Sequence, residues 1–192
     1  MKPNRLAALL LVMLALGTAV SAGSGTRAKA AAAKPTPAAL LAQGRYLVTI
    51  MACNDCHTPG TFYGAPDASR FLAGSEMGWG GPWGVAYAAN LTPDAETGLG
   101  KWTEAQIAKA LRTGNRPDGR QLAAIMPWQD FAALSDHDAL AIAAYLKSLP
   151  PVKHAVPKPV EPGQPVQGPV AVFPAPSAWD APRTPPSATE KK

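Results

Sequence analysis

The sequence contains very little cysteine and only one long apolar run. Two of its 192 residues are cysteine, which excludes a framework of several disulfides. The longest uncharged apolar run is residues 6–22, which excludes a protein with several membrane-spanning helices. Acidic residues are absent from residues 1–37, which carry five bases, whereas residues 38–149 carry eight bases and ten acids. The formal net charge of +5 therefore lies in the flanks, and the basic surface of a nucleic-acid-binding domain is missing.

The amino terminus has the features of an export signal in their usual order. Lys2 and Arg5 precede the apolar run, and Val20, Ser21 and Ala22 supply small residues for cleavage after Ala22. We therefore predict a signal peptide over residues 1–22 and a flexible leader over residues 23–37. An uncleaved membrane anchor is the alternative, although the run is shorter than the ~20 apolar residues of a typical span. Membrane association is expected only if this segment is not cleaved.

The only strong chemical signal in the chain is Cys53-Asn54-Asp55-Cys56-His57. Cys-x-x-Cys-His is the attachment pattern of c-type haem. Positions i, i+3 and i+4 of a helix share a face, so the two thiols can bond to the two vinyl groups on one porphyrin edge. The histidine then lies beneath the iron as an axial ligand. The motif predicts one covalent haem c on Cys53 and Cys56, with His57 bound to the iron.

Three other interpretations of the cysteine pair have less support. A thioredoxin-like site would need a strand–helix–strand setting, and no strand-like alternation flanks the motif. A zinc site would need a fourth ligand. His137 or His154 could supply it, but the sequence has no second Cys-x-x-Cys and no His-x-x-x-His pair. A disulfide across so short a loop would be strained.

A second axial ligand must approach the opposite face of the haem. The methionine and histidine candidates outside the motif are Met51, Met77, Met126, His137 and His154. Met51 is tied to the same side as the motif, and Met77 lies in a glycine-rich stretch that fixes a ligand poorly. Met126 precedes Pro127, which disfavours a helical conformation at Met126 and lets an extended segment present the side chain. A thioether is a known partner of histidine on cytochrome iron, so we predict Met126 as the second ligand, with ordinary core packing as the alternative.

Helical patterns surround the haem motif. Residues 38–52 lack proline and have the apolar spacing of a helix that leads into the motif. Thr103 and Gln106 form a capping-box pattern at the start of a second helix, which Gly114 ends. Residues 127–134 fit a short helical piece, and residues 135–149 fit a last helix that stops before two prolines. These patterns predict an all-α domain over residues 38–150.

Glycine and proline dominate the remaining regions. Residues 58–101 are glycine-rich and predict long loops. Residues 151–192 contain 11 of the 21 prolines and show neither helical nor strand periodicity, so we predict a disordered Pro-rich tail. A docking arm for a partner, anchored by Phe173 and Trp179, is the alternative interpretation of this tail.

The chain resembles the class I cytochrome c family. It is similar in particular to the cytochrome c domains in the electron-transfer subunits of bacterial periplasmic dehydrogenases. The resemblance covers about residues 38–150. Besides the haem motif, it rests on these stretches: Gly44-Arg-Tyr46, Asn90-Leu-Thr-Pro-Asp94, Gly98-Leu-Gly-Lys-Trp102, Ala110-Leu-Arg-Thr-Gly114, Pro117-Asp-Gly119, Met126-Pro127 and Ala144-Tyr-Leu-Lys-Ser-Leu149.

The resemblance implies a small class I cytochrome c-like fold wrapped around one covalent haem, with long loops. It implies a crossing of the first and last helices, with Gly44 against Tyr145, and an axial pair of His57 and Met126. By position, Trp102 and Arg112 are candidate donors to the haem propionates, with core packing and solvation as the respective alternatives.

The expected function is that of a periplasmic, single-haem electron carrier and not an enzyme. Its partners would be a donor, with a periplasmic dehydrogenase as one candidate, and a downstream acceptor. The multi-haem subunits repeat the domain, whereas one haem motif is present here, so a free shuttle fits as well as a subunit. The alternative function is a haem-based enzyme or ligand-binding module with an open iron position.

Overall fold

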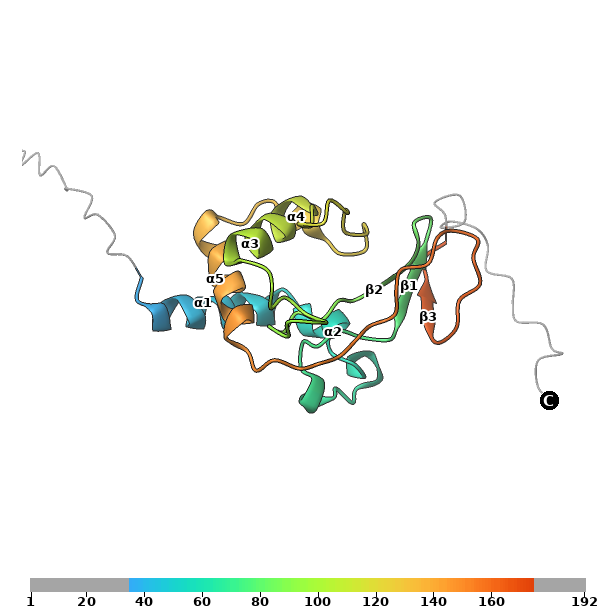
Figure 1. Cartoon of the computed structure of the whole chain (residues 1–192), viewed down its shortest axis with the longest axis horizontal. Helices are drawn as coiled ribbons and strands as arrows, with labels where there is room; N and C mark the ends of the chain where they lie inside the picture. Colours follow the sequence, from blue (N-terminus) through green and yellow to red (C-terminus); the bar gives the residue numbers. More distant parts are fainter. Residues whose placement is uncertain (1–34, 175–192) are drawn as a thin grey trace, which may run out of the picture. The chain divides into compact units, whose positions relative to one another are not determined.

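The computed structural model describes residues 35–174 (Figure 1). The predicted signal peptide, almost all of the predicted leader and residues 175–192 of the predicted tail lie outside the described residues. The elements in chain order are α1 (Pro37–Ile50), α2 (Cys53–His57), the 3₁₀ turns η1 (Thr61–Tyr63) and η2 (Ala68–Arg70), β1 (Gly78–Gly81), β2 (Gly84–Tyr87), α3 (Glu104–Thr113), α4 (Trp128–Phe131), α5 (Asp136–Ser148) and β3 (Val170–Val172). None of the helices in this part of the chain is both long and apolar enough to cross a membrane.

The three long helices begin at residues that satisfy their first backbone N–H groups. Thr36 accepts a hydrogen bond from the Ala39 N–H at the start of α1, and Ser135 accepts one from the Asp138 N–H at the start of α5. The capping box predicted for α3 is present between Thr103 and Gln106. Gly114 ends α3 at φ 71°, a left-handed conformation that favours glycine. Local sequence therefore determines where these helices begin and where α3 ends.

The hydrophobic core lies where α1, α3 and α5 pack together. Its buried side chains are Leu47, Val48, Leu72, Leu99, Ile107, Ile142, Ala143 and Leu146. The predicted contact of Gly44 with α5 is present: a Cβ added at Gly44 would overlap the backbone oxygen of Ala141 and lie 2.7 Å from the Cβ of Tyr145. Only glycine lets the two helices approach so closely.

The predicted all-α fold class is wrong, because the described residues also form a three-stranded mixed sheet of order β2-β1-β3 (Figure 1). β1 pairs antiparallel with β2 and parallel with β3. The strand β1 consists almost entirely of glycine, so it lacks the β-branched side chains that usually reveal a strand. A Cβ at Gly78 would lie 2.7 Å from Val85 Cγ1, and one at Gly80 would lie 3.1 Å from Val170 Cγ1. Valine side chains of the neighbouring strands fill the space beside these glycines. This packing stabilises β1, although β1 itself lacks alternating apolar and polar side chains.

The prediction of a disordered tail is also wrong for residues 151–174, the first part of that tail. Residues 152–173, which we call the strap, pass along the domain and bond to it at several points. Val160 and Val85 exchange two backbone hydrogen bonds of 2.8 and 2.9 Å. Gly78 donates to the Pro169 oxygen, and the Phe173 N–H donates to the Gly80 oxygen. Proline has no N–H, so only the residues between the prolines can donate backbone hydrogen bonds to the sheet. Runs this short leave no periodicity in the sequence.

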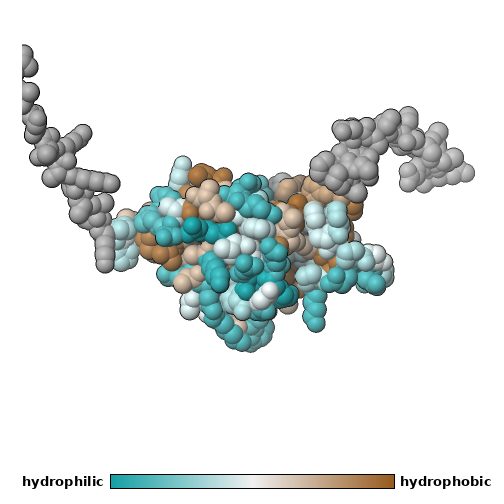
Figure 2. Space-filling model, turned by 90° about the horizontal axis from the view of Figure 1, so that it is seen from above, coloured by the Kyte–Doolittle hydropathy of each residue, from teal (hydrophilic) through white to brown (hydrophobic). Residues whose placement is uncertain are grey.

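Aromatic rings join the end of the strap to the sheet. Phe173 stacks on Trp79 with ring centroids 6.2 Å apart, and Phe62 meets Trp79 edge-on at 5.2 Å. Phe62 and Phe173 nevertheless stay about half exposed. Figure 2 shows apolar surface at the end of the molecule that carries the sheet and also at the end that carries α1. Phe173, one predicted anchor of a docking arm, thus packs on the chain itself, while Trp179 lies outside the described residues.

Candidate haem site

The haem motif forms its own short helix, α2, directly after α1. Ala52 has a positive φ of 54°, and this left-handed residue separates α2 from the end of α1. Cys53, Cys56 and His57 therefore lie on one helical turn, as the spacing predicts. Both cysteines are free and partly buried, whereas His57 is only 8% exposed.

The orientation of the His57 ring is fixed by a hydrogen bond to the backbone. Its Nδ1 lies 2.7 Å from the carbonyl oxygen of Ala89. A carbonyl oxygen can only accept, so the proton must be on Nδ1, and Nε2 keeps its lone pair. Burial lowers the pKa of His57, and the hydrogen bond to Ala89 only partly opposes this effect. The ring is therefore neutral at neutral pH, which is the form that binds a metal ion.

The two thiols have the properties of unreactive cysteines. Burial raises the pKa of Cys53 to about 11, against the opposing effect of a backbone hydrogen bond. Burial also raises the pKa of Cys56, and the nearby charge of Asp55 adds to this effect. Redox-active Cys-x-x-Cys pairs need a lowered pKa so that a thiolate can attack. The electrostatics of the site therefore disfavour the thioredoxin-like interpretation.

Two backbone segments form hydrogen bonds with His57 and with each other. In the first, residues 72–75, Gly74 donates to the His57 oxygen at 2.8 Å. In the second, residues 88–91, Ala89 accepts the His57 ring proton. Hydrogen bonds from the Ser75 N–H to the Ala88 oxygen and from the Leu91 N–H to the Leu72 oxygen tie the two segments together. No sequence signal marks Ala89 as a site residue, since every residue carries a backbone carbonyl group.

Met126 belongs to a different part of the fold. It is partly buried and ends a turn in which its N–H donates to the Ala123 oxygen, directly before Pro127 and α4. Contacts between elements place α4 on α3, whereas α2 packs on α1 and η1. In Figure 1, α3 and α4 lie on one side and α2 on the other. This separation from α2 suits a ligand for the second haem face, which has to come from a part of the fold other than the one that carries His57.

The other four candidate ligands have diverse surroundings. Met51 caps α1 and packs against the core, and His137 is exposed in the first turn of α5. Both ring nitrogens of His154 lie beside oxygen acceptors, at Ala73 and Glu76. Met77 lines a hollow of about 110 Å³ together with Cys56, which places it beside the motif.

Buried donors without acceptors test whether the chain fits a haem. Within residues 35–174, Trp128 Nε1 and Arg116 Nε are buried and have no hydrogen-bond partner. Trp128 packs on Gly114, where an added Cβ would lie 2.8 Å from its ring, and Arg116 lies over the ring of Trp102 at 5.5 Å. A buried donor left unpaired is costly, so both call for an acceptor from outside the chain. Haem propionates are such acceptors, and the residues fit the group.

The sequence predicts Trp102 and Arg112 as the propionate donors. Arg112 forms an ion pair with Asp136 of α5. Arg116 pairs with Asp118 through Nη2 at 3.3 Å, so it is the Nε of Arg116 that still needs an acceptor. The ring of Trp102 packs beneath Arg116. Arg116 and Trp128 carry no local sequence signal of this role, because their burial depends on contacts between α3, α4 and the loop that joins them.

Known proteins with similar sequences include the cytochrome subunits of bacterial dehydrogenases. No family model matches the chain. The fructose dehydrogenase cytochrome subunit of Gluconobacter japonicus is 36% identical over 140 residues, which are 70% of this chain and 27% of that protein. The cytochrome c subunit of an alcohol dehydrogenase (quinone) from Gluconobacter oxydans is 38% identical over 116 residues, 60% of this chain and 23% of that protein. A diheme cytochrome c-type protein of Cereibacter sphaeroides is 37% identical over 116 residues, 58% of this chain and 36% of that protein.

The chain thus spans about a quarter to a third of the length of these relatives. Their names agree with the class of protein that the haem motif and the surrounding stretches predict. The predicted resemblance is therefore confirmed: along the matched residues, the chain is similar to the cytochrome c subunits of bacterial dehydrogenases.

Proposed function

We propose that the chain is a c-type cytochrome that carries electrons one at a time and catalyses no reaction on a substrate. One haem c is attached through Cys53 and Cys56 and supplies a ferric/ferrous couple. The observation that carries this proposal is the setting of His57, which shares a helical turn with both thiols and has its Nδ1 proton bound by Ala89 at 2.7 Å. This hydrogen bond selects the tautomer whose Nε2 can bind iron.

Met126 is the second axial ligand in this proposal. Pro127 holds the segment out of a helix, and the unpaired donors of Arg116 and Trp128 lie in the same part of the chain. A thioether ligand raises the potential of a haem iron relative to a second histidine, which suits a carrier that accepts electrons from an enzyme. Met77 is the competing ligand, because it lines a hollow with Cys56.

The partners are a dehydrogenase as electron donor and a downstream acceptor. The relatives that are named as cytochrome subunits of dehydrogenases support this choice of donor. Export to the periplasm follows from the signal-peptide pattern of residues 1–22. Covalent haem in that compartment would let the protein exchange electrons either as a free shuttle or as a subunit.

Redox titration of the full chain tests this function. The protein is purified from a bacterial host with cytochrome c maturation machinery. One reversible one-electron transition is expected, together with a weak sulfur-to-iron charge-transfer band in the near infrared for the ferric form. Met126→Leu should remove this band and lower the potential, and Met77→Leu, the matched control, should leave both unchanged.

Each opposite outcome rejects a defined part of the proposal. Loss of the band in Met77→Leu but not in Met126→Leu would assign the ligand to Met77. A wild-type spectrum without any methionine ligation, combined with rapid binding of carbon monoxide, would favour a ligand-binding module or enzyme. A protein without covalent haem would reject the whole function.

A further inference from the structure

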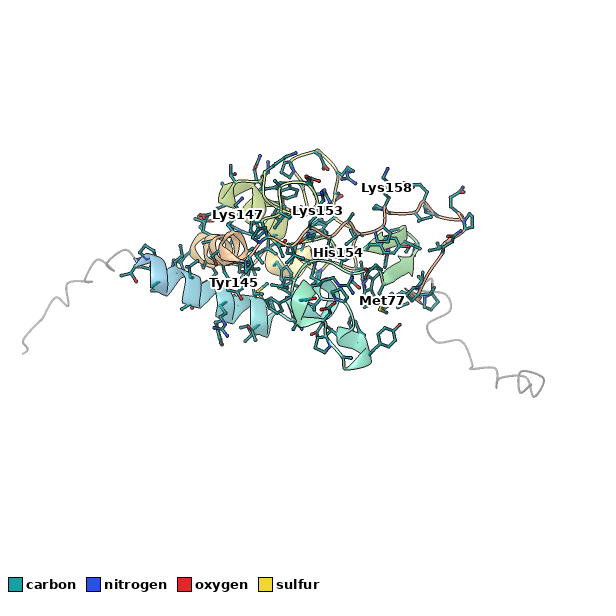
Figure 3. All side chains as sticks on the ribbon, turned by 60° about the horizontal axis from the view of Figure 1, so that its bottom comes forward. Met77, Tyr145, Lys147, Lys153, His154 and Lys158 are labelled. Carbon is teal, nitrogen blue, oxygen red and sulfur yellow. The ribbon has the colours of Figure 1, made fainter. Side chains whose placement is uncertain are left out.

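A partly buried histidine side chain anchors the strap to the domain. The side chain of His154 is 13% exposed, its Nδ1 lies 2.8 Å from the Ala73 oxygen, and its Nε2 lies 2.9 Å from Glu76 Oε1. Its backbone N–H donates to Thr97 Oγ1. Figure 3 shows the strap running from α5 toward the sheet, with His154 and Lys158 on opposite sides of it. The ring therefore holds the strap against residues 73–76.

The fully buried side chain of Asn90 also holds the strap against the domain. Asn90 is only 1% exposed, and its Nδ2 donates to the Val152 oxygen at 2.8 Å and to Thr97 Oγ1 at 3.0 Å. Its Oδ1 accepts hydrogen bonds from the N–H and the hydroxyl of Thr92. The Val152 N–H in turn donates to Thr92 Oγ1 at 3.1 Å. Both polar atoms of the Asn90 side chain are thus hydrogen-bonded, and its Nδ2 joins the strap to residues 90–97.

His154 and Asn90 act on the same two backbone segments that contact His57. His154 bonds to residues 72–75, and Asn90 is part of residues 88–91. Ala73, which accepts from His154, directly precedes Gly74, which donates to the His57 oxygen at 2.8 Å. Asn90 directly follows Ala89, the acceptor of the His57 ring proton. The strap also presses on Gly74 itself, where an added Cβ would lie 2.5 Å from Val156 Cγ1. In each segment, the residue that bonds to the strap is therefore the direct neighbour of the residue that bonds to His57.

We propose that the strap positions the haem-binding histidine, with His154 and Asn90 as its positioning residues. This inference rests on the proposed function of the site. His154 and Asn90 hold the two segments at the spacing that keeps the Ala89 oxygen in line with the His57 ring. A strong hydrogen bond at Nδ1 makes the ring a better electron donor and favours ferric iron. Loosening the strap should weaken this hydrogen bond and raise the reduction potential.

The experiment uses the haem-loaded full chain and four variants. His154→Ala removes the ring contact, and His154→Asn keeps a side-chain N–H that can reach the Ala73 oxygen. Asn90→Asp keeps the acceptor for Thr92 but removes the donor to Val152. Lys158→Ala is the matched control, since Lys158 is an exposed residue of the same strap. The readouts are the reduction potential and the rate at which the His57 Nδ1 proton exchanges with solvent in the reduced protein.

His154→Ala and Asn90→Asp should each raise the reduction potential. In both variants the His57 Nδ1 proton should exchange about tenfold faster, which is the change expected when one net hydrogen bond is lost. His154→Asn should restore most of both values, and Lys158→Ala should match the wild type. If potential and exchange in all four variants equal the wild-type values, the strap does not position His57 and the inference fails. If His154→Ala does not fold, Asn90→Asp still decides: wild-type potential and exchange in that variant would overturn the inference. Failure of the proposed function looks different, because the wild-type protein would then carry no covalent haem.

Discussion

The helical core and the sheet region with its strap are held together by different interactions. In the core, side chains such as Val48, Ile107 and Ile142 are at least 95% buried, and the helices touch through them. In the sheet region, glycines face the neighbouring strand, and backbone hydrogen bonds join β1, β2 and the strap. The core should therefore respond to changes of side-chain volume, and the sheet region to the loss of backbone partners.

The largest expected effect is at Gly44, where the two long helices of the core cross. In Gly44→Ala the new methyl group would overlap the backbone oxygen of Ala141, which cannot move without shifting α5. Overpacking of this kind should lower the free energy of unfolding by about 3 kcal/mol. Urea unfolding of the haem-loaded protein measures the change.

Gly78→Ala is the matched substitution in the sheet. Its methyl group would meet Val85 Cγ1 at 2.7 Å, the end of a side chain that can shift. We expect a loss of about 1 kcal/mol. A cost at Gly78 equal to or above that at Gly44 would contradict the contrast between the two regions.

Removal of the strap should have the next largest effect. Ending the chain after Pro150 removes the hydrogen bonds to Val85, Gly78 and Asn90. Each bond contributes about 1 kcal/mol net, but ordering the strap costs entropy, so we expect a loss of about 2 kcal/mol in all. Thermal unfolding with calorimetry measures it.

A chain that ends after Pro174 is the control, because every described contact of the strap remains. It should unfold close to the wild-type temperature. If the shorter chain, ending after Pro150, is as stable as the wild type, the strap does not contribute to the fold.

The smallest effect concerns the acid that meets His154. Burial raises the pKa of Glu76, but hydrogen bonds from its own backbone, from His154 and from Arg70 lower it by more, so it lies below the ordinary 4.5. A carboxyl group whose folded-state pKa is lowered stabilises the fold fully above its unfolded pKa, and this stabilisation is lost as the pH falls through the folded-state value. Wild type should thus exceed Glu76→Gln in stability at pH 7, and the difference should shrink below pH 4.5.

Unfolding free energies of both proteins between pH 3 and pH 7 give this comparison. A Glu76 difference that is constant with pH would mean that its carboxylate does not anchor the strap.

The helical core could be predicted from the sequence because its signals are local. Thr103 with Gln106, and Ser135 at the start of α5, are short patterns whose capping bonds form within three residues. The haem motif is local in the same sense, since its three side chains share one turn. The confirmed contact of Gly44 with α5 came from the family resemblance and not from the local pattern.

The sheet and the strap could not be predicted, because their interactions are long-range and made by the backbone. The glycines of β1 carry no side-chain pattern, and Val160 pairs with a residue 75 positions away. Ala89 gave no signal because its contribution to the site is a carbonyl oxygen. Arg116 and Trp128 are identified only by donors that the fold leaves unpaired. The role of Met126 stays a prediction.

The central claim is that Cys53 and Cys56 hold one covalent haem. Intact-protein mass spectrometry of the chain, exported from a host with cytochrome c maturation machinery, tests it most directly. The mass should exceed that of the polypeptide by one haem, and the peptide that carries the extra mass should contain Cys53 and Cys56. Replacing both cysteines by serine should remove the added mass. A wild-type chain with the mass of the bare polypeptide, or with the haem on any other peptide, would contradict the account.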